Sequence, residues 1–319
     1  MEPEAPSQGA TFEFCYRHPH EVTGVHCTRC GRPICPECMI PAPVGYQCPE
    51  CVAEARKAFR QGPVRQVRQV RQASLTNITL GILIAIYVVQ VVTGQGLGLG
   101  LTSSGTDPLI VRGGMQPAAV AAGDYYRLFT AMFLHLSLLH ILFNGWALLI
   151  FGRFVEQSLG RVAWATIFLV GGLCGSVASY VFGPPGVVSA GASGAIVALF
   201  GAFIAYNFRR RHDPMSRANL MSAIVIILLN VFLTLGESQI DYRAHLGGLV
   251  GGLVLGAVFD GLGPRRMQNF VRVGTVVAVM VVLVILVGMR TSDLHAQFGG
   301  EQLALAKQCL LHPNLLACR

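Results

Sequence analysis

The sequence predicts an all-α membrane protein with a small cysteine-rich domain at its N-terminus. Of its 319 residues, 53% are hydrophobic and only 13% are charged, whereas a soluble chain carries about 25% charged residues. Long apolar segments follow one another from residue 75 onward, and seven of the ten cysteines lie between Cys15 and Cys51. We therefore expect a bundle of transmembrane helices attached to a compact cysteine-rich head.

Composition divides the chain into five parts. Residues 1–54 are rich in Cys, His and Pro, and residues 55–74 form a basic, Gln-rich linker. Residues 75–265 hold six of the apolar segments, residues 266–291 hold the seventh, and residues 292–319 are expected to form a tail.

Each apolar segment is close to the roughly 20 residues that a helix needs to cross a bilayer. Only helices and closed barrels satisfy their backbone groups in lipid, and continuous apolar runs of this length favour helices. The predicted spans are residues 75–93, 128–151, 162–182, 193–208, 218–235, 244–261 and 271–289.

Lys and Arg alternate along the connections between these spans. They are dense in the linker and after the second, fourth and sixth spans, and sparse in the other connections. By the positive-inside rule, the N-terminus is cytoplasmic and the C-terminus external in a multi-pass protein of the cell membrane. The net charge of +8 therefore fits cytoplasmic loops facing a lipid bilayer, and no nucleic-acid partner is expected. The basic linker is a candidate for contact with anionic lipid.

Polar residues inside the spans gather where the second, fourth and sixth spans begin, all on the external side. His140 and Asn144 share one face of the second span, Ser193 opens the fourth, and His245 opens the sixth. Taken singly, a membrane Ser bonds back to its own helix and a membrane His bonds a neighbouring helix. Together they supply a nucleophile with a base and donors for an oxyanion. Gly248, on the same side as His245, favours close approach of helices.

Three stretches carry a resemblance to a known family. They are GASG at 191–194, HLSLLHILFN at 135–144 and AHLGG at 244–248. In this combination they resemble the rhomboid intramembrane serine proteases over about residues 75–265. The resemblance implies a six-helix rhomboid-like bundle, here with a seventh, C-terminal transmembrane helix.

The resemblance also implies roles for individual residues. Ser193 matches the nucleophile and His245 the general base of a dyad. His140 and Asn144, with the backbone N–H of Ser193, match the oxyanion hole.

Other positions follow or depart from the family pattern. Arg127 and Glu156 match a pair that braces the external loop in relatives. Relatives often place an aromatic residue one turn after the serine to stack on the catalytic histidine, but this chain has Val197. Asp241, four residues before His245, is expected to face water at the helix entrance rather than to orient the histidine.

The implied function is a serine endopeptidase that cuts membrane proteins in or near transmembrane segments that are locally helix-destabilised. The alternative is a catalytically silent rhomboid-like scaffold that binds transmembrane helices. A transporter would carry ionisable residues through the depth of the bundle, and this chain has one cluster at a single depth.

The head contains four pairs of potential metal ligands, each with two residues between its members, which is typical of structural zinc. Eight ligands make two tetrahedral sites, and an interleaved order would put the first and third pairs on one ion. The order resembles a B-box-type zinc finger, and His20 and His26 are alternatives to His18. The candidate ligands are Cys15, His18, Cys27, Cys30, Cys35, Cys38, Cys48 and Cys51.

The head is expected to be structural, because closed thiolate sites leave no open position for chemistry. It is therefore a candidate for binding a cytoplasmic protein partner or for regulation, and no cofactor is expected for catalysis itself. Cys309 and Cys318 are expected on the external side, where a disulfide between them can form.

Overall fold

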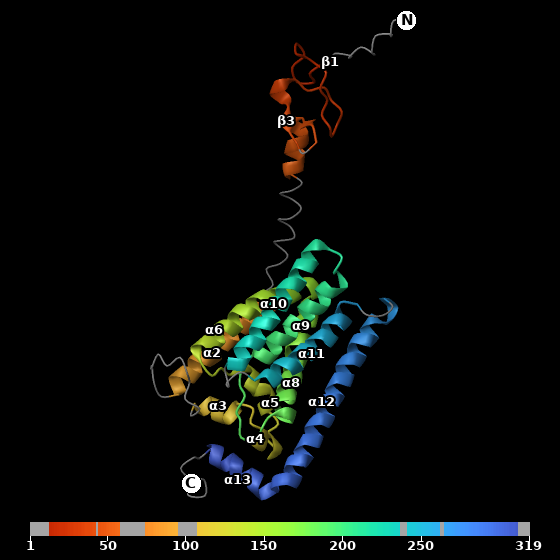
Figure 1. The fold of residues 1–319 in the computed structure, drawn as a ribbon. Helices are drawn as coiled ribbons and strands as arrows, with labels where there is room; N and C mark the ends of the chain where they lie inside the picture. The colour runs from red at the N-terminus through yellow and green to blue at the C-terminus, as the bar shows by residue number, and fades with distance from the viewer. Residues whose placement is uncertain are drawn as a thin grey trace. The chain divides into compact units, whose positions relative to one another are not determined.

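The structure is a computed structural model that describes residues 13–42, 44–57, 74–94, 107–236, 241–261 and 265–311; at 229–236 and 265 it describes the backbone alone. The chain divides into two units, Met1–Ala73 and Ser74–Arg319 (Figure 1).

The N-terminal unit is built from very short elements. Strand β1 (Glu13–Phe14) pairs with β2 (Val22–Thr23), and β3 (Ile40–Pro41) pairs with β4 (Tyr46–Gln47), both antiparallel. The 3₁₀ turn η1 (Pro36–Cys38) precedes β3, and residues 49–57 are helical. The buried centre consists of six cysteines and Ile34. So small an apolar core needs cross-links or metal ions to fold.

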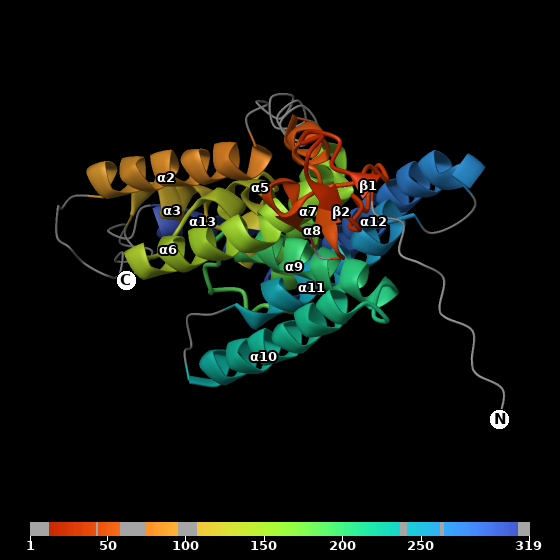
Figure 2. The same cartoon turned by 90° about the horizontal axis from the view of Figure 1, so that it is seen from above.

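The second unit is a helical bundle, shown from two directions in Figures 1 and 2. Five of its helices, within the described residues, are long and apolar enough to cross a membrane, and two shorter apolar helices join them. The protein is thus a multi-pass membrane protein. These seven segments are α2 (Leu75–Thr93), α6 (Leu138–Ala147) continued by the π-helical turn η3 (Leu148–Gly152) and α7 (Arg153–Leu159), α8 (Arg161–Phe182), α9 (Ser193–Arg209), α10 (Pro214–Gly236), α11 (Tyr242–Phe259) and α12 (Gln268–Phe298). Of these, α9 and α10 are the two shorter ones within the described residues.

Short helices cap one end of this bundle. They are α3 (Pro108–Gly113), α4 (Pro117–Ala121), α5 (Arg127–Thr130), the 3₁₀ turn η2 (Ala131–Phe133) and α13 (Gly300–Leu311). The 3₁₀ turn η4 (Arg265–Met267) does not belong to this group and directly precedes the start of α12.

The structure changes two of the predicted spans. The predicted span 128–151 is wrong in its first ten residues, because the long helix begins at Leu138 and the chain is extended at Leu134 and Ser137. The seventh helix runs to Phe298 rather than to 289, and α13 follows within the predicted tail. Gly299, with φ of 73°, makes the turn between α12 and α13.

Helices α8, α9 and α11 form the centre of the bundle, and α2 and α10 lie on opposite sides of it (Figure 2). Small residues line the contacts between these three helices. A Cβ at Gly252 would overlap the carbonyl oxygen of Ala198, and a Cβ at Gly256 would lie 2.5 Å from the Cα of Ala202. The helices therefore meet backbone to backbone, which is the packing mode available where lipid removes the hydrophobic drive for association.

Candidate active site and metal centres

Ser193 is the first residue of α9 and is half-buried. The loop before it ends at Gly191, whose φ is 149° and whose N–H donates to the carbonyl of Ala131 at 2.9 Å. A Cβ at Gly191 would lie 2.8 Å from Nε2 of His140 and 3.7 Å from Oγ of Ser193. The serine hydroxyl and the His140 ring therefore flank the same point of the backbone, and glycine is needed to leave them room.

His245 stands in the first turn of α11, next to the place where this helix contacts α9. A Cβ at Gly248 would overlap the carbonyl oxygen of Gly194, and a Cβ at Gly194 would lie 3.5 Å from the carbonyl oxygen of Ala244. Gly194 follows Ser193 directly, and Ala244 precedes His245. The backbones that carry the two predicted dyad residues thus touch.

Between the side chains of Ser193 and His245, both among the described residues, the structure gives no hydrogen bond. The structure brings the starts of α9 and α11 together, and the hydrogen bond between Ser193 and His245 stays a prediction.

His140 and Asn144 lie four residues apart on α6, which packs against α9. The hydroxyl of Ser137 accepts a hydrogen bond from the N–H of His140 at 3.1 Å and so caps the start of α6. Asn144 is buried, and its Nδ2 has no hydrogen-bond partner in the part of the chain that is described. A buried amide donor without a partner is costly, and it is available to an incoming oxygen.

The N–H of Ser193 belongs to the first turn of α9, where helix amides have no carbonyl partner within the helix. The positive end of the helix dipole adds to it. Chemically, these groups can stabilise a negative oxygen that develops beside the Ser193 hydroxyl.

A support behind His140 was not predicted from the sequence. The His135 ring is fully buried and packs edge-on against the His140 ring, with centroids 5.3 Å apart. The Gln90 side chain of α2 bonds both backbone groups of His135, at 3.0 and 3.1 Å. The signals were a Gln within the first span and a Ser three residues before His140, which marks a helix cap.

Asp241 is half-buried at the entrance of α11, and its carboxylate makes hydrogen bonds that the sequence did not predict. Its Oδ1 accepts hydrogen bonds from the N–H groups of Arg243 and Ala244 and caps α11, while its Oδ2 accepts one from the Ser179 hydroxyl. Asp241 thus fixes the helix end that carries His245, and none of its side-chain hydrogen bonds goes to the imidazole.

Arg127 and Glu156 do not form the predicted brace together. Arg127 is fully buried and donates to the carbonyls of Val111 and Gly114 at 2.8 and 3.0 Å. Glu156 instead accepts four hydrogen bonds from the first turn of α2, from Ser74, Leu75 and Thr76. The two residues flank a helix that starts at Leu138 and rises about 1.5 Å per residue, so Glu156 lies about 27 Å along it.

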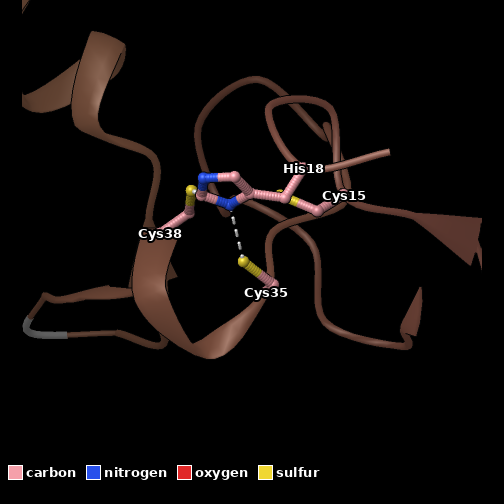
Figure 3. Close-up of side chains that lie close together, drawn as sticks. All are labelled: Cys15, His18, Cys35 and Cys38. Carbon is pink, nitrogen blue, oxygen red and sulfur yellow. Dashed lines mark hydrogen bonds between the residues drawn. The ribbon is translucent and has the colours of Figure 1, made fainter. Parts of the chain in front are cut away.

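In the N-terminal unit, the eight predicted ligands fall into two groups in the interleaved order. Cys15, His18, Cys35 and Cys38 form one group, and within each group the donor atoms lie within 4.8 Å of one another. Figure 3 shows the His18 ring between the sulfurs of Cys35 and Cys38, with Nδ1 3.2 Å from the first and 3.5 Å from the second.

The second group consists of Cys27, Cys30, Cys48 and Cys51. The Sγ atoms of Cys30 and Cys48 lie 3.8 Å apart. A tetrahedron with Zn–S bonds of about 2.3 Å has edges of about 3.8 Å. The spacing and the soft donors therefore fit zinc.

The thiols in these groups influence each other strongly. Burial favours the neutral Cys15 thiol, but hydrogen bonds with the backbone of Cys35, Arg17 and His18 outweigh burial and lower its pKa to about 6. Burial, followed by interactions with Cys15 and Cys35, raises the pKa of Cys38 to about 11. Several thiolates at one point repel each other, and a bound cation removes that conflict. The donor set is thus suited to a metal ion.

Comparison with known proteins adds to this geometry. Residues 122–261 match the family model described as the rhomboid domain. The chain is 37% identical over 157 residues to "Rhomboid protease GluP" of Bacillus subtilis, covering 49% of this chain and 30% of that protein. It is 32% identical over 136 residues to "Putative rhomboid protease YdcA" of the same species, covering 43% of this chain and 68% of the relative. "Rhomboid-like protease 2" of Toxoplasma gondii is 32% identical over 174 residues, with 54% and 61% covered.

Proposed function

The chain belongs to the rhomboid family, and from this premise we propose that it is an intramembrane serine endopeptidase. It would hydrolyse peptide bonds in or near the transmembrane segments of membrane proteins. The match covers only 30% of the length of GluP. The activity and the substrates of the present chain are therefore our proposals.

One observation supports the proposal most. The loop ending at Gly191 sets the Ser193 hydroxyl beside His140, while Gly194 lies against Gly248 in the turn of α11 that carries His245. Helix packing alone does not require His140 beside the loop that precedes Ser193, or the first turn of α11 against Gly194.

In the proposed reaction, His245 takes the proton of the Ser193 hydroxyl, and the oxygen attacks the substrate carbonyl. The oxyanion accepts hydrogen bonds from the Ser193 N–H, the Asn144 amide and the His140 ring. His245 then protonates the leaving amine, and water releases the acyl group. The substrate helix must unwind locally, because a helical peptide bond is shielded, so helix-destabilised segments are the expected substrates.

We propose that the start of α9 faces the outside, with the N-terminus in the cytoplasm. The alternation of Lys and Arg along the connections supports this orientation.

Labelling with a fluorophosphonate, together with cleavage of a reconstituted transmembrane substrate, tests the proposal. Both signals should be present in the wild type and absent from Ser193→Ala and His245→Ala. Ser222→Ala is the matched control, because that hydroxyl is exposed and, among the described residues, donates only to the carbonyl of Ala218 in its own helix. It should label and cleave like the wild type.

Asn144→Ala should lower kcat by about 10²- to 10³-fold, since it removes one oxyanion donor. A folded wild type that neither labels nor cleaves would refute the protease and favour the silent scaffold that binds transmembrane helices.

For the N-terminal unit we propose two structural Zn²⁺ ions, one on each ligand group. The closed ligand sets support a structural role and a surface for a cytoplasmic protein partner. Metal analysis of the full-length protein should give two zinc ions per chain, and one or none would contradict the assignment.

A further inference from the structure

Helix α13 folds back onto the short helices at the end of the bundle where α9 and α11 begin. It contacts α4 and α3 (Figure 1), and its Leu303 is buried in the same apolar cluster as Val120 and Leu294. His295, in the last turn of α12, bonds the carbonyl of Ala121 at 2.9 Å. His295 and all of α13 lie outside residues 122–261, the part of the chain that matches the family. The family pattern therefore does not account for this contact.

One ion pair ties α13 to the rest of the bundle. Lys307 Nζ lies 2.6 Å from Oδ1 of Asp124, whose Oδ2 lies 3.1 Å from Nε of Arg127. The side chains of Asp124 and Arg127 are 12% and 1% exposed, and that of Lys307 is 29% exposed. This pair is therefore less screened than an ordinary surface ion pair.

The contacts continue from Arg127 toward the nucleophile. Arg127 donates to the carbonyl of Gly114, and the next residue, Met115, forms a two-way backbone bridge with Ser189, at 2.9 and 2.8 Å. Gly191, two residues further on, flanks Ser193 and His140. Lys307 is thus linked to the loop before Ser193 by bonded groups at every step.

We propose that α13 is a brace for the loop that carries Ser193, and that Lys307 is a positioning residue acting through Asp124 and Arg127. The inference rests on the proposed function for its effect on catalysis. Without Lys307, Asp124 keeps one cationic partner, Arg127 is held less firmly, and the Met115–Ser189 bridge opens more often.

Hydrogen exchange of the full-length protein in detergent tests the brace without using activity. In Lys307→Met the amides of Met115 and Ser189 should exchange about fivefold faster, the size expected for a partly buried ion pair. Lys307→Arg should restore wild-type exchange, and Gln308→Ala, an exposed neighbour on α13, should leave it unchanged. The Ile167 amide, in the middle of α8, should be unaffected in all variants.

Cleavage kinetics provide the second measurement. Lys307→Met should lower kcat about fivefold with KM unchanged, and Lys307→Arg should rescue it. Leu303→Ala weakens the apolar docking of α13 and should change amide exchange and kcat in the same way as Lys307→Met. It replaces Lys307→Met in both experiments if that variant does not fold. Unchanged exchange at Met115 and Ser189, or equal acceleration at Ile167, would overturn the brace. If the wild type neither cleaved nor labelled, the proposed protease function would be refuted. The hydrogen-exchange result would then decide by itself whether α13 braces the loop before Ser193.

Discussion

Substituting Gly248 by alanine should impair the proposed active site while leaving every proposed catalytic group in place. The added Cβ would overlap the carbonyl oxygen of Gly194 and lie 3.0 Å from its carbonyl carbon and 3.3 Å from its Cα. These three atoms are backbone, so no side chain can rotate away. Carbon atoms prefer about 3.5–4.0 Å, which means that α9 and α11 must separate by about 0.5–1 Å.

The magnitude follows from that displacement. Overpacking of this kind costs about 1–3 kcal/mol of stability. A misplacement of about 1 Å between reacting groups costs on the order of 10²-fold in rate. Because Gly194 adjoins Ser193 and Gly248 lies three residues after His245, the separation moves nucleophile and base apart.

The assay is the rate of fluorophosphonate labelling of Ser193, measured beside the unfolding temperature in detergent. Gly248→Ala should label about 100-fold more slowly in the protein that remains folded. Gly274→Ala is the control, since a Cβ at Gly274 would meet nothing within 4 Å. Wild-type labelling by Gly248→Ala would show that the contact of Gly194 with Gly248 does not set the geometry of the site, and the reasoning would fail.

Three further predictions concern the groups that hold helix ends and metal. Asp241→Ala removes the cap of α11 and should cost about 0.5–2 kcal/mol of stability, seen as a lower unfolding temperature, whereas Asp241→Asn should keep most of it; equal losses would contradict capping. Glu156→Gln replaces the carboxylate that accepts four hydrogen bonds at the start of α2, and it should lower the free energy of unfolding by about 1.5–3 kcal/mol. Labelling of Ser193 in the folded fraction should stay unchanged; slower labelling of that fraction would argue against a purely structural role of Glu156. Cys38→Ser should reduce the zinc content of the full chain from two ions to one, and an unchanged content would exclude Cys38 as a ligand.

The zinc ligands could be grouped from the sequence because their spacing is local. Two residues between ligands set both on one turn, and the pairs alternate between two sites. The structure adds that His18 rather than His20 or His26 joins Cys15, through Nδ1. It also gives Cys309 as disulfide-bonded, as expected for an external tail, while the predicted partner Cys318 lies outside the described residues.

The sequence did not predict two features of the structure correctly: the separation of Arg127 from Glu156, and helix α13. The pairing of Arg127 with Glu156 ignored the length of the helix between them, which separates them by most of the membrane thickness. The division of the sequence by composition predicts only a tail where α13 forms, although Leu303, Ala306 and Leu310 recur at helical spacing after the exposed Glu301. That pattern predicts a short amphipathic helix and could have been found.

The sequence by itself determined the membrane-spanning character, most of the spans, the family and the kinds of side chain at the candidate site. These depend on hydrophobic length, on charge alternation and on motifs within a few residues of each other. Tertiary structure alone decided which glycine faces which carbonyl, that Asn144 is left with a free donor among the described residues, and that Lys307 reaches Asp124. Those contacts join residues up to 183 positions apart, and their geometry depends on how whole helices pack.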